Sequence, residues 1–262
     1  MAEVVDWDAA EYRRVSDLQR WLAERAISGL ELEGVERVLD VGCGDGRITT
    51  RIAIALARGE VVGIDPSPRM VKAAASADMP PTAATAHFEI GDVLTMRFHA
   101  EFDLVVSFNA LHWVIDQRQA LARIAAALRA GGRALLVMVC AGPRRSLEQV
   151  AMDIVAMDPW RPFFADFAAP FAHVEPERFG DMAASMRLAT VDAHVDDLSW
   201  DFGSAETFRR WCRVGFGAWT SRLPDALAER FVDDVAAAYA KVSGSPQLFR
   251  FMQLRSRLVK RG

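Results

Sequence analysis

The sequence predicts an α/β fold with a doubly wound, largely parallel sheet. Two observations favour it: valine-rich apolar runs alternate with amphipathic segments over residues 35–140, and glycine or proline residues stand at many of the junctions. Strands that alternate with helices pair in parallel, because each helix carries the chain back across one face of the sheet. A chain of 262 residues with this pattern is expected to form a single domain, 1–262.

Five short apolar runs have the length and the valine content of buried parallel strands. They span residues 35–42, 60–65, 86–93, 102–111 and 133–140. The segments between them have helical periodicity, and we expect helices over 45–59, from Pro66 or Ser67 onward, and over 116–132. Gly59 is expected to end the first of these helices, and Gly131 with Gly132 the last, because glycine commonly ends a helix.

The second half of the chain loses this alternation and predicts helical insertions around two more strands. Helices are expected over 144–157, 175–188, 204–219 and 224–242, and strands over 190–202 and from Leu248 onward. The stretch 158–179 is rich in proline and aromatic residues, and it forms either a core beneath these helices or a lid over them. The basic last strand is expected at a solvated edge of the sheet.

Composition excludes several classes of function. Apolar residues make up 52% of the chain and charged residues 25%, which is typical of a globular core and not of disorder. The net charge of −4 gives no electrostatic footprint for nucleic acid, so no nucleic-acid partner is expected. The cysteines, Cys43, Cys140 and Cys212, are too widely spaced to indicate a disulfide framework or a metal site.

The N-terminal segment “MAEVVDWDAAEYRR” carries charges where a signal peptide needs an apolar stretch. No run of about 18 apolar residues indicates a membrane span. We therefore expect a cytoplasmic protein.

The first predicted strand leads into a glycine-rich turn, “GCGDG”, at residues 42–46. Glycine permits positive φ and lacks a Cβ, so backbone N–H groups of such a turn approach a ligand closely. The dinucleotide-binding pattern Gly-x-Gly-x-x-Gly is broken, because Arg47 stands where its third glycine belongs. Asp45 within the turn further disfavours a pyrophosphate, and Asp40 just before the turn favours a ligand with a positive amine over one with two phosphates.

Two more acids stand where neighbouring strands are predicted to end. Asp65 closes the second strand, where an acid can hold both hydroxyls of a ribose. Asp92 closes the third strand, where a carboxylate can accept from an exocyclic adenine amine. A turn for an amino-acid tail, an acid for ribose and an acid for adenine together indicate S-adenosylmethionine as the cofactor.

Five segments in order strengthen this interpretation: “VLDVGCGDGRIT”, “VVGIDPSPRMVKAA”, “FEIGDV”, “FDLVVSFNALHWV” and “ALRAGGRALL”. Together the sequence resembles a class I S-adenosylmethionine-dependent methyltransferase, most strongly over 35–140. The resemblance implies a Rossmann-like seven-stranded sheet, with 35–140 as the cofactor-binding core. The segments 1–30, 141–189 and 203–246 then form a helical cap and substrate pocket, from insertions before strand six and between strands six and seven.

The resemblance also assigns cofactor contacts. It implies that Asp40, Gly42 and Gly44 hold the methionine portion, Asp65 the ribose, and Asp92 with Val93 the adenine, on whose ring Met70 packs. Cys43, Pro66, Gly91 and Asn109 complete the expected cofactor site, and Tyr12 lies over the cofactor if the N-terminal helix closes the site. No metal ligands are expected.

The segments expected to bind the methyl acceptor favour a small-molecule substrate. “NALHW” stands where methyltransferases of exocyclic base amines carry Asn-Pro-Pro-Tyr-like residues, and the chain has no Pro-Cys pair of the kind that attacks cytosine C5. The predicted N-terminal helix (7–26) together with “FNALHWV” resembles the juvenile hormone acid and trans-aconitate carboxyl methyltransferases. That resemblance implies that Gln19 and Trp113 hold the substrate carboxylate, which needs no base because it is ionised at neutral pH.

Alternatives remain open at this point. Trp113 is equally typical of a core position, and Gln19 is equally typical of a solvated helix face. In a second alternative, His112 serves as a general base for an oxygen, nitrogen or carbon acceptor of secondary metabolism. A nicotinamide dehydrogenase is disfavoured by the broken glycine pattern, whereas a non-catalytic cofactor-binding protein is not excluded.

The predicted cap also bears on the substrate. Its aromatic content favours an apolar or mixed carboxylic acid, whereas Arg144, Arg145 and Arg161 leave room for a polyacid. The other four histidines, His87, His99, His173 and His194, are scattered, and we expect them to be structural or exposed.

Overall fold

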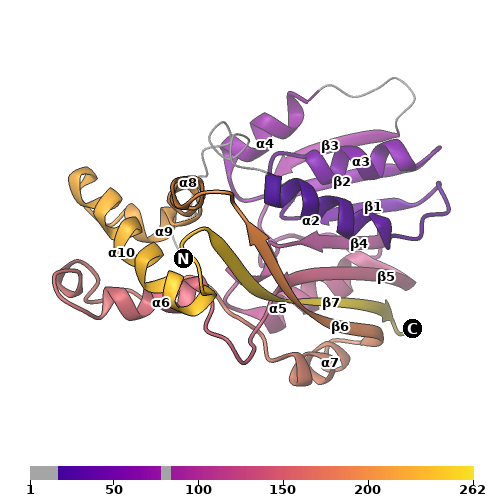
Figure 1. The fold of residues 1–262 in the computed structure, drawn as a ribbon. Helices are drawn as coiled ribbons and strands as arrows, with labels where there is room; N and C mark the ends of the chain where they lie inside the picture. Colours follow the sequence, from indigo (N-terminus) through magenta and orange to yellow (C-terminus); the bar gives the residue numbers. More distant parts are fainter. Residues whose placement is uncertain (1–16, 78–83) are drawn as a thin grey trace.

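The computed structural model describes residues 17–77 and 84–262. Its centre is a sheet of seven strands: β1 (Arg37–Val41), β2 (Glu60–Asp65), β3 (Thr85–Ile90), β4 (Phe102–Phe108), β5 (Leu128–Val139), β6 (Leu188–Asp201) and β7 (Leu248–Lys260). The strand order is β3-β2-β1-β4-β5-β7-β6 (Figure 1). β1 to β5 pair in parallel, and β7 runs antiparallel to both β5 and β6. The predicted doubly wound sheet is therefore confirmed.

Helices cover both faces of the sheet. α2 (Asp17–Ser28) and α3 (Arg47–Ala55) pack on one face, α5 (Gln117–Ala127) and α7 (Pro176–Ser185) on the other, and α4 (Pro68–Ala75) contacts β2 and β3. Successive residues of a strand point to opposite faces. Val38 accordingly belongs to the buried cluster that contains Ile52 of α3, whereas the next residue, Leu39, belongs to the cluster that contains Ile124 of α5.

A helical cap lies beyond the carboxyl ends of the parallel strands (Figure 1). It consists of α6 (Leu147–Val155), α8 (Ala205–Gly215), α9 (Gly217–Thr220), α10 (Asp225–Ser243) and the 3-10 turn η2 (Arg161–Phe163). Its aromatic core includes Trp160 and Phe164, whose ring centroids lie 5.2 and 5.5 Å from that of Phe231. The stretch 158–179 therefore contributes core residues at these two positions, whereas Phe163 is 37% exposed.

Three predicted helix ends are wrong. α3 ends at Ala55 and not at Gly59, because Leu56 takes an extended conformation that buries its side chain completely. α5 ends at Ala127 and not at residue 132, because Leu128 already pairs with Phe102 of β4. The predicted helix 204–219 is divided at Phe216 into α8 and α9.

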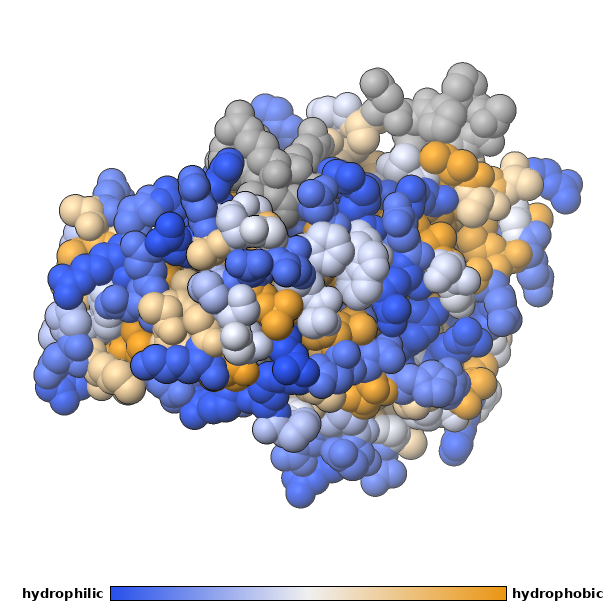
Figure 2. Space-filling model, in the orientation of Figure 1, coloured by the Kyte–Doolittle hydropathy of each residue, from blue (hydrophilic) through white to orange (hydrophobic). Residues whose placement is uncertain are grey.

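The position predicted for the last strand is also wrong. β7 has a hydrogen-bonded neighbour on each side, and β6 forms that edge of the sheet. Figure 2 shows mostly hydrophilic side chains on one face of the molecule, with hydrophobic ones in smaller groups. In the described part of the chain, no helix combines the length and the apolar character that crossing a membrane requires.

Candidate active site

The turn after β1 lies at the carboxyl edge of the sheet, and three glycines with positive φ shape it. The φ values are 75° at Gly42, 56° at Gly44 and 77° at Gly46. The N–H groups of Gly42 and Cys43 both donate to the carbonyl of Ile64, at 2.8 and 3.0 Å. These bonds attach the turn to the end of β2.

Only one of these glycines has an open side. A Cβ on Gly42 would lie 2.2 Å from the Cβ of Ala110, and a Cβ on Gly46 would lie 2.7 Å from that of Ala74. A Cβ on Gly44 would meet no atom of the described chain within 4 Å. Gly42 and Gly46 are thus required by packing, and Gly44 is the position of the turn where a ligand can approach the backbone.

Two of the predicted acids lie at this edge. Asp65 ends β2, and its carboxylate accepts hydrogen bonds from the N–H groups of Gly44 (3.0 Å) and Ser67 (2.9 Å). Burial raises the pKa of Asp65 despite these two bonds. Asp92 follows β3, is half-buried, and accepts from the N–H of Leu94 at 2.8 Å.

Asp40 occupies a different environment from the other acids. It is 1% exposed, and its carboxyl accepts from the hydroxyl of Thr49 in α3, with 2.6 Å between the oxygens. Burial raises the pKa of Asp40 to about 7. The side chain connects β1 to α3 directly behind the turn, and its contact with the methionine portion stays a prediction.

Apolar side chains lie near the same edge. Met70 is 3% exposed and its N–H donates to the hydroxyl of Ser67, which caps α4, and Val93 is 4% exposed. Cys43 is buried, and burial raises the pKa of its thiol. Pro66 is exposed.

Gly91 and Asn109 complete the predicted residues on this side that the structure describes. The N–H of Gly91 donates to the carbonyl of Asp65 at 3.1 Å. Asn109 has a positive φ of 53°, and its side-chain oxygen accepts from the amide of Gln253 in β7 at 2.8 Å. Tyr12 lies outside the described residues.

The acceptor-side candidates lie on η1 (Leu111–Trp113), which follows β4, and on α2. His112 is 4% exposed, its Nδ1 is buried without a hydrogen-bond partner, and burial together with His173 lowers its pKa to about 3. The ring of Trp113 lies 5.1 Å from that of His112 and 6.3 Å from that of Trp219. The Oε1 atom of Gln19 is buried without a partner.

Sequence reasoning missed His173 and Glu148. The side chain of His173 is only 4% exposed, its Nε2 lies 3.8 Å from a carboxylate oxygen of Glu148, and its ring lies 6.2 Å from that of His112. A backbone hydrogen bond of 2.8 Å from Ala172 N–H to the His112 carbonyl holds this segment against η1. The aromatic residues before His173 are the sequence signal nearest to it, and they indicate burial without indicating a site.

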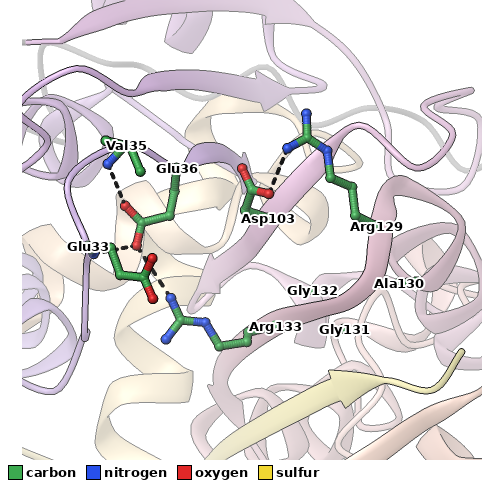
Figure 3. A pocket seen from close by; sticks show the side chains of 9 residues that line it. All are labelled: Glu33, Val35, Glu36, Asp103, Arg129, Ala130, Gly131, Gly132 and Arg133. Atoms are coloured by element: carbon green, nitrogen blue, oxygen red, sulfur yellow. Dashed lines mark hydrogen bonds and ion pairs between the residues drawn. The ribbon is translucent and has the colours of Figure 1, made fainter.

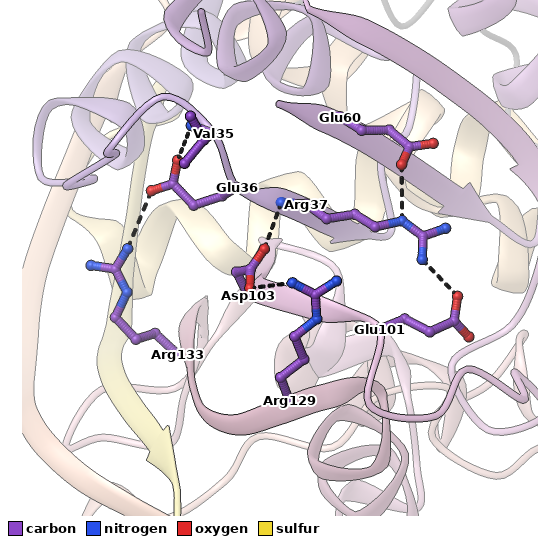
Figure 4. A network of polar contacts seen from close by, with 8 residues as sticks. All are labelled: Val35, Glu36, Arg37, Glu60, Glu101, Asp103, Arg129 and Arg133. Atoms are coloured by element: carbon purple, nitrogen blue, oxygen red, sulfur yellow. Dashed lines mark hydrogen bonds and ion pairs between the residues drawn. The ribbon is translucent and has the colours of Figure 1, made fainter. Parts of the chain in front are cut away.

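A hollow of about 400 Å³ lies at the opposite edge of the sheet, at the amino ends of β1, β4 and β5 (Figure 3). Four of the charged side chains that line it form pairs: Arg129 with Asp103 at 2.7 Å, and Arg133 with Glu36 at 3.4 Å. The neighbouring Arg37 extends this network to Glu60 and Glu101 (Figure 4). These contacts join the strand starts, and the hollow is remote from the glycine turn.

The residues at the carboxyl edge fit S-adenosylmethionine. Gly44 offers an open backbone, Asp65 and Asp92 are half-buried carboxylates on adjacent strands, and Met70 and Val93 supply buried apolar surface. Within the ranges 17–77 and 84–262, no group of three or more His, Cys, Asp or Glu side chains is arranged to hold a metal ion.

Comparisons with known proteins indicate a methyltransferase. A family model described as “Methyltransferase domain” matches residues 38–132. A trans-aconitate 2-methyltransferase from Variovorax paradoxus is 32% identical over 265 residues, covering 96% of this chain and 97% of that protein. Another from Delftia acidovorans is 26% identical, with coverage of 96% and 97%. The crystal structure of the YcgJ protein from Bacillus subtilis matches with a TM-score of 0.64 at 19% identity, covering 93% of this chain and 99% of that one.

The relative at 32% identity extends over nearly the whole of both chains, and the strand order is that of the fold shared with the solved structure. S-adenosylmethionine is the methyl donor of such enzymes. The chain therefore belongs to the class I S-adenosylmethionine-dependent methyltransferases.

Proposed function

We propose that this enzyme transfers a methyl group to the carboxylate of a small organic acid and releases the methyl ester. The observation that carries the proposal is the neutral character of the candidate donors on α2 and η1. The amide of Gln19 and the indole of Trp113 carry neutral N–H groups, and no lysine or arginine is buried in the described part of the chain. The relatives named trans-aconitate 2-methyltransferase support a carboxylate acceptor.

When bound, S-adenosylmethionine supplies a methyl group on a positively charged sulfur, which is already activated for transfer. The residues of the chain then have to hold both reactants in line and exclude water. Asp65, Asp92 and the open side of Gly44 hold the cofactor in this proposal. Met70 and Val93 cover its adenine.

Gln19 and Trp113 orient the acceptor. Neutral N–H donors hold one carboxylate oxygen without the strong ion pair that would lower the nucleophilicity of the other. The buried polar end of the Gln19 side chain can present its nitrogen inward by a half-turn of the terminal amide. No proton has to be removed, because a carboxylate is ionised at neutral pH.

Label transfer tests this function. The protein is incubated with methyl-labelled S-adenosylmethionine and a pool of small carboxylic acids and phenols, and the product is treated with base. Base-labile label is expected, because esters hydrolyse whereas methyl ethers, amines and carbon-bound methyl groups do not. Base-stable label would contradict the proposal.

Variants test the carboxylate contacts. Gln19→Ala and Trp113→Ala are expected to lose ester formation while S-adenosylhomocysteine still binds in calorimetry. Gln247→Ala, which removes a glutamine amide that contacts Asp201 just before β7, is the matched control. Full ester formation by both site variants would show that neither side chain holds the acceptor.

A further inference from the structure

Buried polar atoms without partners are concentrated near η1. Seven side-chain nitrogen or oxygen atoms of the described residues are buried without a hydrogen bond, and four of them belong to His112, His173 and Trp219. Burying a polar atom without a partner is unfavourable, so native proteins rarely retain such groups without a reason. A ligand that supplies the missing partners is one such reason.

Aromatic ring contacts connect these side chains. The ring of Phe171 lies 4.6 Å from that of His173 and 6.4 Å from that of Trp219. The ring of Trp113 lies 6.3 Å from that of Trp219. We call His173, Trp219 and the adjoining Glu148 the inner polar cluster, and the aromatic rings of Trp113 and Phe171 border it.

The charge of the inner polar cluster limits what it can bind. Glu148 is 7% exposed, and its carboxylate approaches Nε2 of His173 to 3.8 Å, which is beyond hydrogen-bonding distance. Burial lowers the pKa of His173, although Glu148 acts in the opposite direction. The indole N–H of Trp219 is a neutral donor. The cluster thus combines a buried acid with neutral donors and acceptors.

The arginines that a polyacid would need are already paired. Arg144 binds Asp197 at 2.6 Å, Arg145 binds Asp153 at 2.7 Å, and Arg161 binds Asp158 at 3.2 Å. Arg222, which lies over the ring of Phe167, is exposed. A second substrate carboxylate in the cluster would therefore be buried beside Glu148 without a cation, which is strongly unfavourable.

A hydroxyl group matches the cluster better. Its hydrogen can be donated to His173 or to Glu148, and its oxygen can accept from the indole N–H of Trp219. We propose that the inner polar cluster binds a hydroxyl group of the acceptor. The substrate is then an apolar monocarboxylic acid that carries a hydroxyl group, and not a polycarboxylate. This inference rests on the proposed function, because it takes the methylated group to be the carboxylate.

Paired substrates test the inference. Straight-chain aliphatic acids are compared with hydroxy acids of the same length, with the hydroxyl at successive positions, and with trans-aconitate as the polycarboxylate. At least one hydroxy acid is expected to exceed its parent acid in kcat/KM by about tenfold or more, because a site built for a hydrogen-bonding group discriminates against the analogue that lacks it. Trans-aconitate is expected to be the poorer substrate.

Variants locate the effect. Trp219→Phe and Glu148→Gln are expected to bring the ratio of hydroxy acid to parent acid close to one. Trp160→Phe is the matched control, because Trp160 is another buried cap tryptophan and its indole N–H donates to Asp234 instead, at 3.0 Å. Thermal unfolding of each variant shows whether the cap remains folded. Retention of the full ratio in both folded cluster variants would overturn the inference, as would a preference for trans-aconitate.

A binding measurement separates this inference from the proposed function. Calorimetry with S-adenosylhomocysteine present measures the affinity for hydroxy and parent acids without turnover. Tighter binding of a hydroxy acid that Trp219→Phe abolishes supports the hydroxyl site even if no base-labile label is formed. Equal binding of all paired acids overturns it even if esters are formed.

Discussion

The carboxylate of Asp65 accepts a hydrogen bond from the backbone N–H of Gly44, with 3.0 Å between Oδ2 and the nitrogen. The other carboxylate oxygen accepts from the N–H of Ser67 at 2.9 Å. One side chain at the end of β2 therefore fixes both the turn after β1 and the start of α4. This places an acid beside the only glycine of residues 42–46 that leaves open space.

Replacing Asp65 by asparagine is expected to weaken cofactor binding. Asp65→Asn puts an amide NH₂ where a carboxylate oxygen now faces an N–H, and it removes a charged acceptor. Hydrogen bonds to charged groups contribute about 1.5–3 kcal/mol, so the affinity for S-adenosylhomocysteine in calorimetry should fall by roughly 10- to 100-fold. The exposed Asp181→Asn is the control. A change of less than about twofold in Asp65→Asn would show that this acid does not contact the cofactor.

Gly44 and Gly131 allow a matched comparison. Both have positive φ, 56° and 75°, and a Cβ on either meets nothing within 4 Å. Gly44→Ala and Gly131→Ala should each lose about 1 kcal/mol of stability, because both place a side chain in a left-handed backbone. Only Gly44→Ala should also bind S-adenosylhomocysteine more weakly. Thermal unfolding and calorimetry check the two effects, and equal affinities would place the cofactor elsewhere.

The strands were predictable because their signal is local. An apolar run such as 60–65 followed by a proline indicates a buried strand whatever surrounds it, and β2 spans these residues. The helix ends could not be predicted in the same way, because they depend on pairing and packing with residues far away in the sequence. Leu128 leaves the helix to pair with Phe102, and Leu56 leaves it to fill the core. The sequence next to Leu128 and Leu56 does not indicate which residues these side chains will contact.

The candidate site likewise contains residues that the sequence predicts and residues that it does not. The glycine turn and Asp65 could be found because each marks the end of a strand, and parallel strands end at one edge. His173 and Glu148 could not. They come from an irregular segment and from α6, and the folded cap brings Nε2 of His173 to 3.8 Å from the carboxylate of Glu148. Their proximity follows from packing of the cap, which no periodicity in the sequence specifies.

Asp40 gives a pH-dependent prediction for stability. Burial raises its pKa from 3.8 to about 7, so the folded state favours the protonated form. Asp40 therefore contributes stability that is fully present below its unfolded pKa and is lost as the pH rises toward 7. The asparagine of Asp40→Asn does not ionise. The free energy of unfolding of this variant, relative to that of the wild-type protein, should therefore rise by up to about 4 kcal/mol between roughly pH 4 and pH 8. Denaturant unfolding without cofactor measures this gain, and parallel stability curves would rule it out.

Glu36 gives the opposite pH dependence. Its carboxylate accepts from the N–H groups of Glu33, Gly34 and Val35 at 2.6, 2.8 and 3.0 Å. Burial alone would raise the pKa of Glu36, but the backbone hydrogen bonds outweigh it and lower the pKa. The stability from this carboxylate is thus present above its unfolded pKa of 4.5 and lost as the pH falls below it.

Glu36→Gln should therefore destabilise the protein by about 1–3 kcal/mol near pH 7, and by less in acid. Cofactor affinity should not change, because the network in Figure 4 lies at the edge of the sheet opposite the glycine turn. The exposed Glu33→Gln is the matched control. Denaturant unfolding at several pH values measures the difference in unfolding free energy between Glu36→Gln and the wild-type protein. A difference that grows as the pH falls would contradict a lowered pKa of Glu36.

His112 distinguishes a carboxylate acceptor from one that needs a base. Burial and His173 lower the pKa of His112 to about 3, so the imidazole stays neutral throughout the neutral range and is a weak base. The rate of ester formation should therefore show no inflection from His112 near pH 6.5, and His112→Asn should leave the shape of the pH profile unchanged. Removing a true general base typically costs 10²- to 10⁴-fold, and the loss of kcat/KM in His112→Asn should be well below that range. The exposed His87→Asn is the control. A loss of about 10³-fold with unchanged cofactor affinity would instead assign proton removal to His112, and with it an acceptor other than a carboxylate.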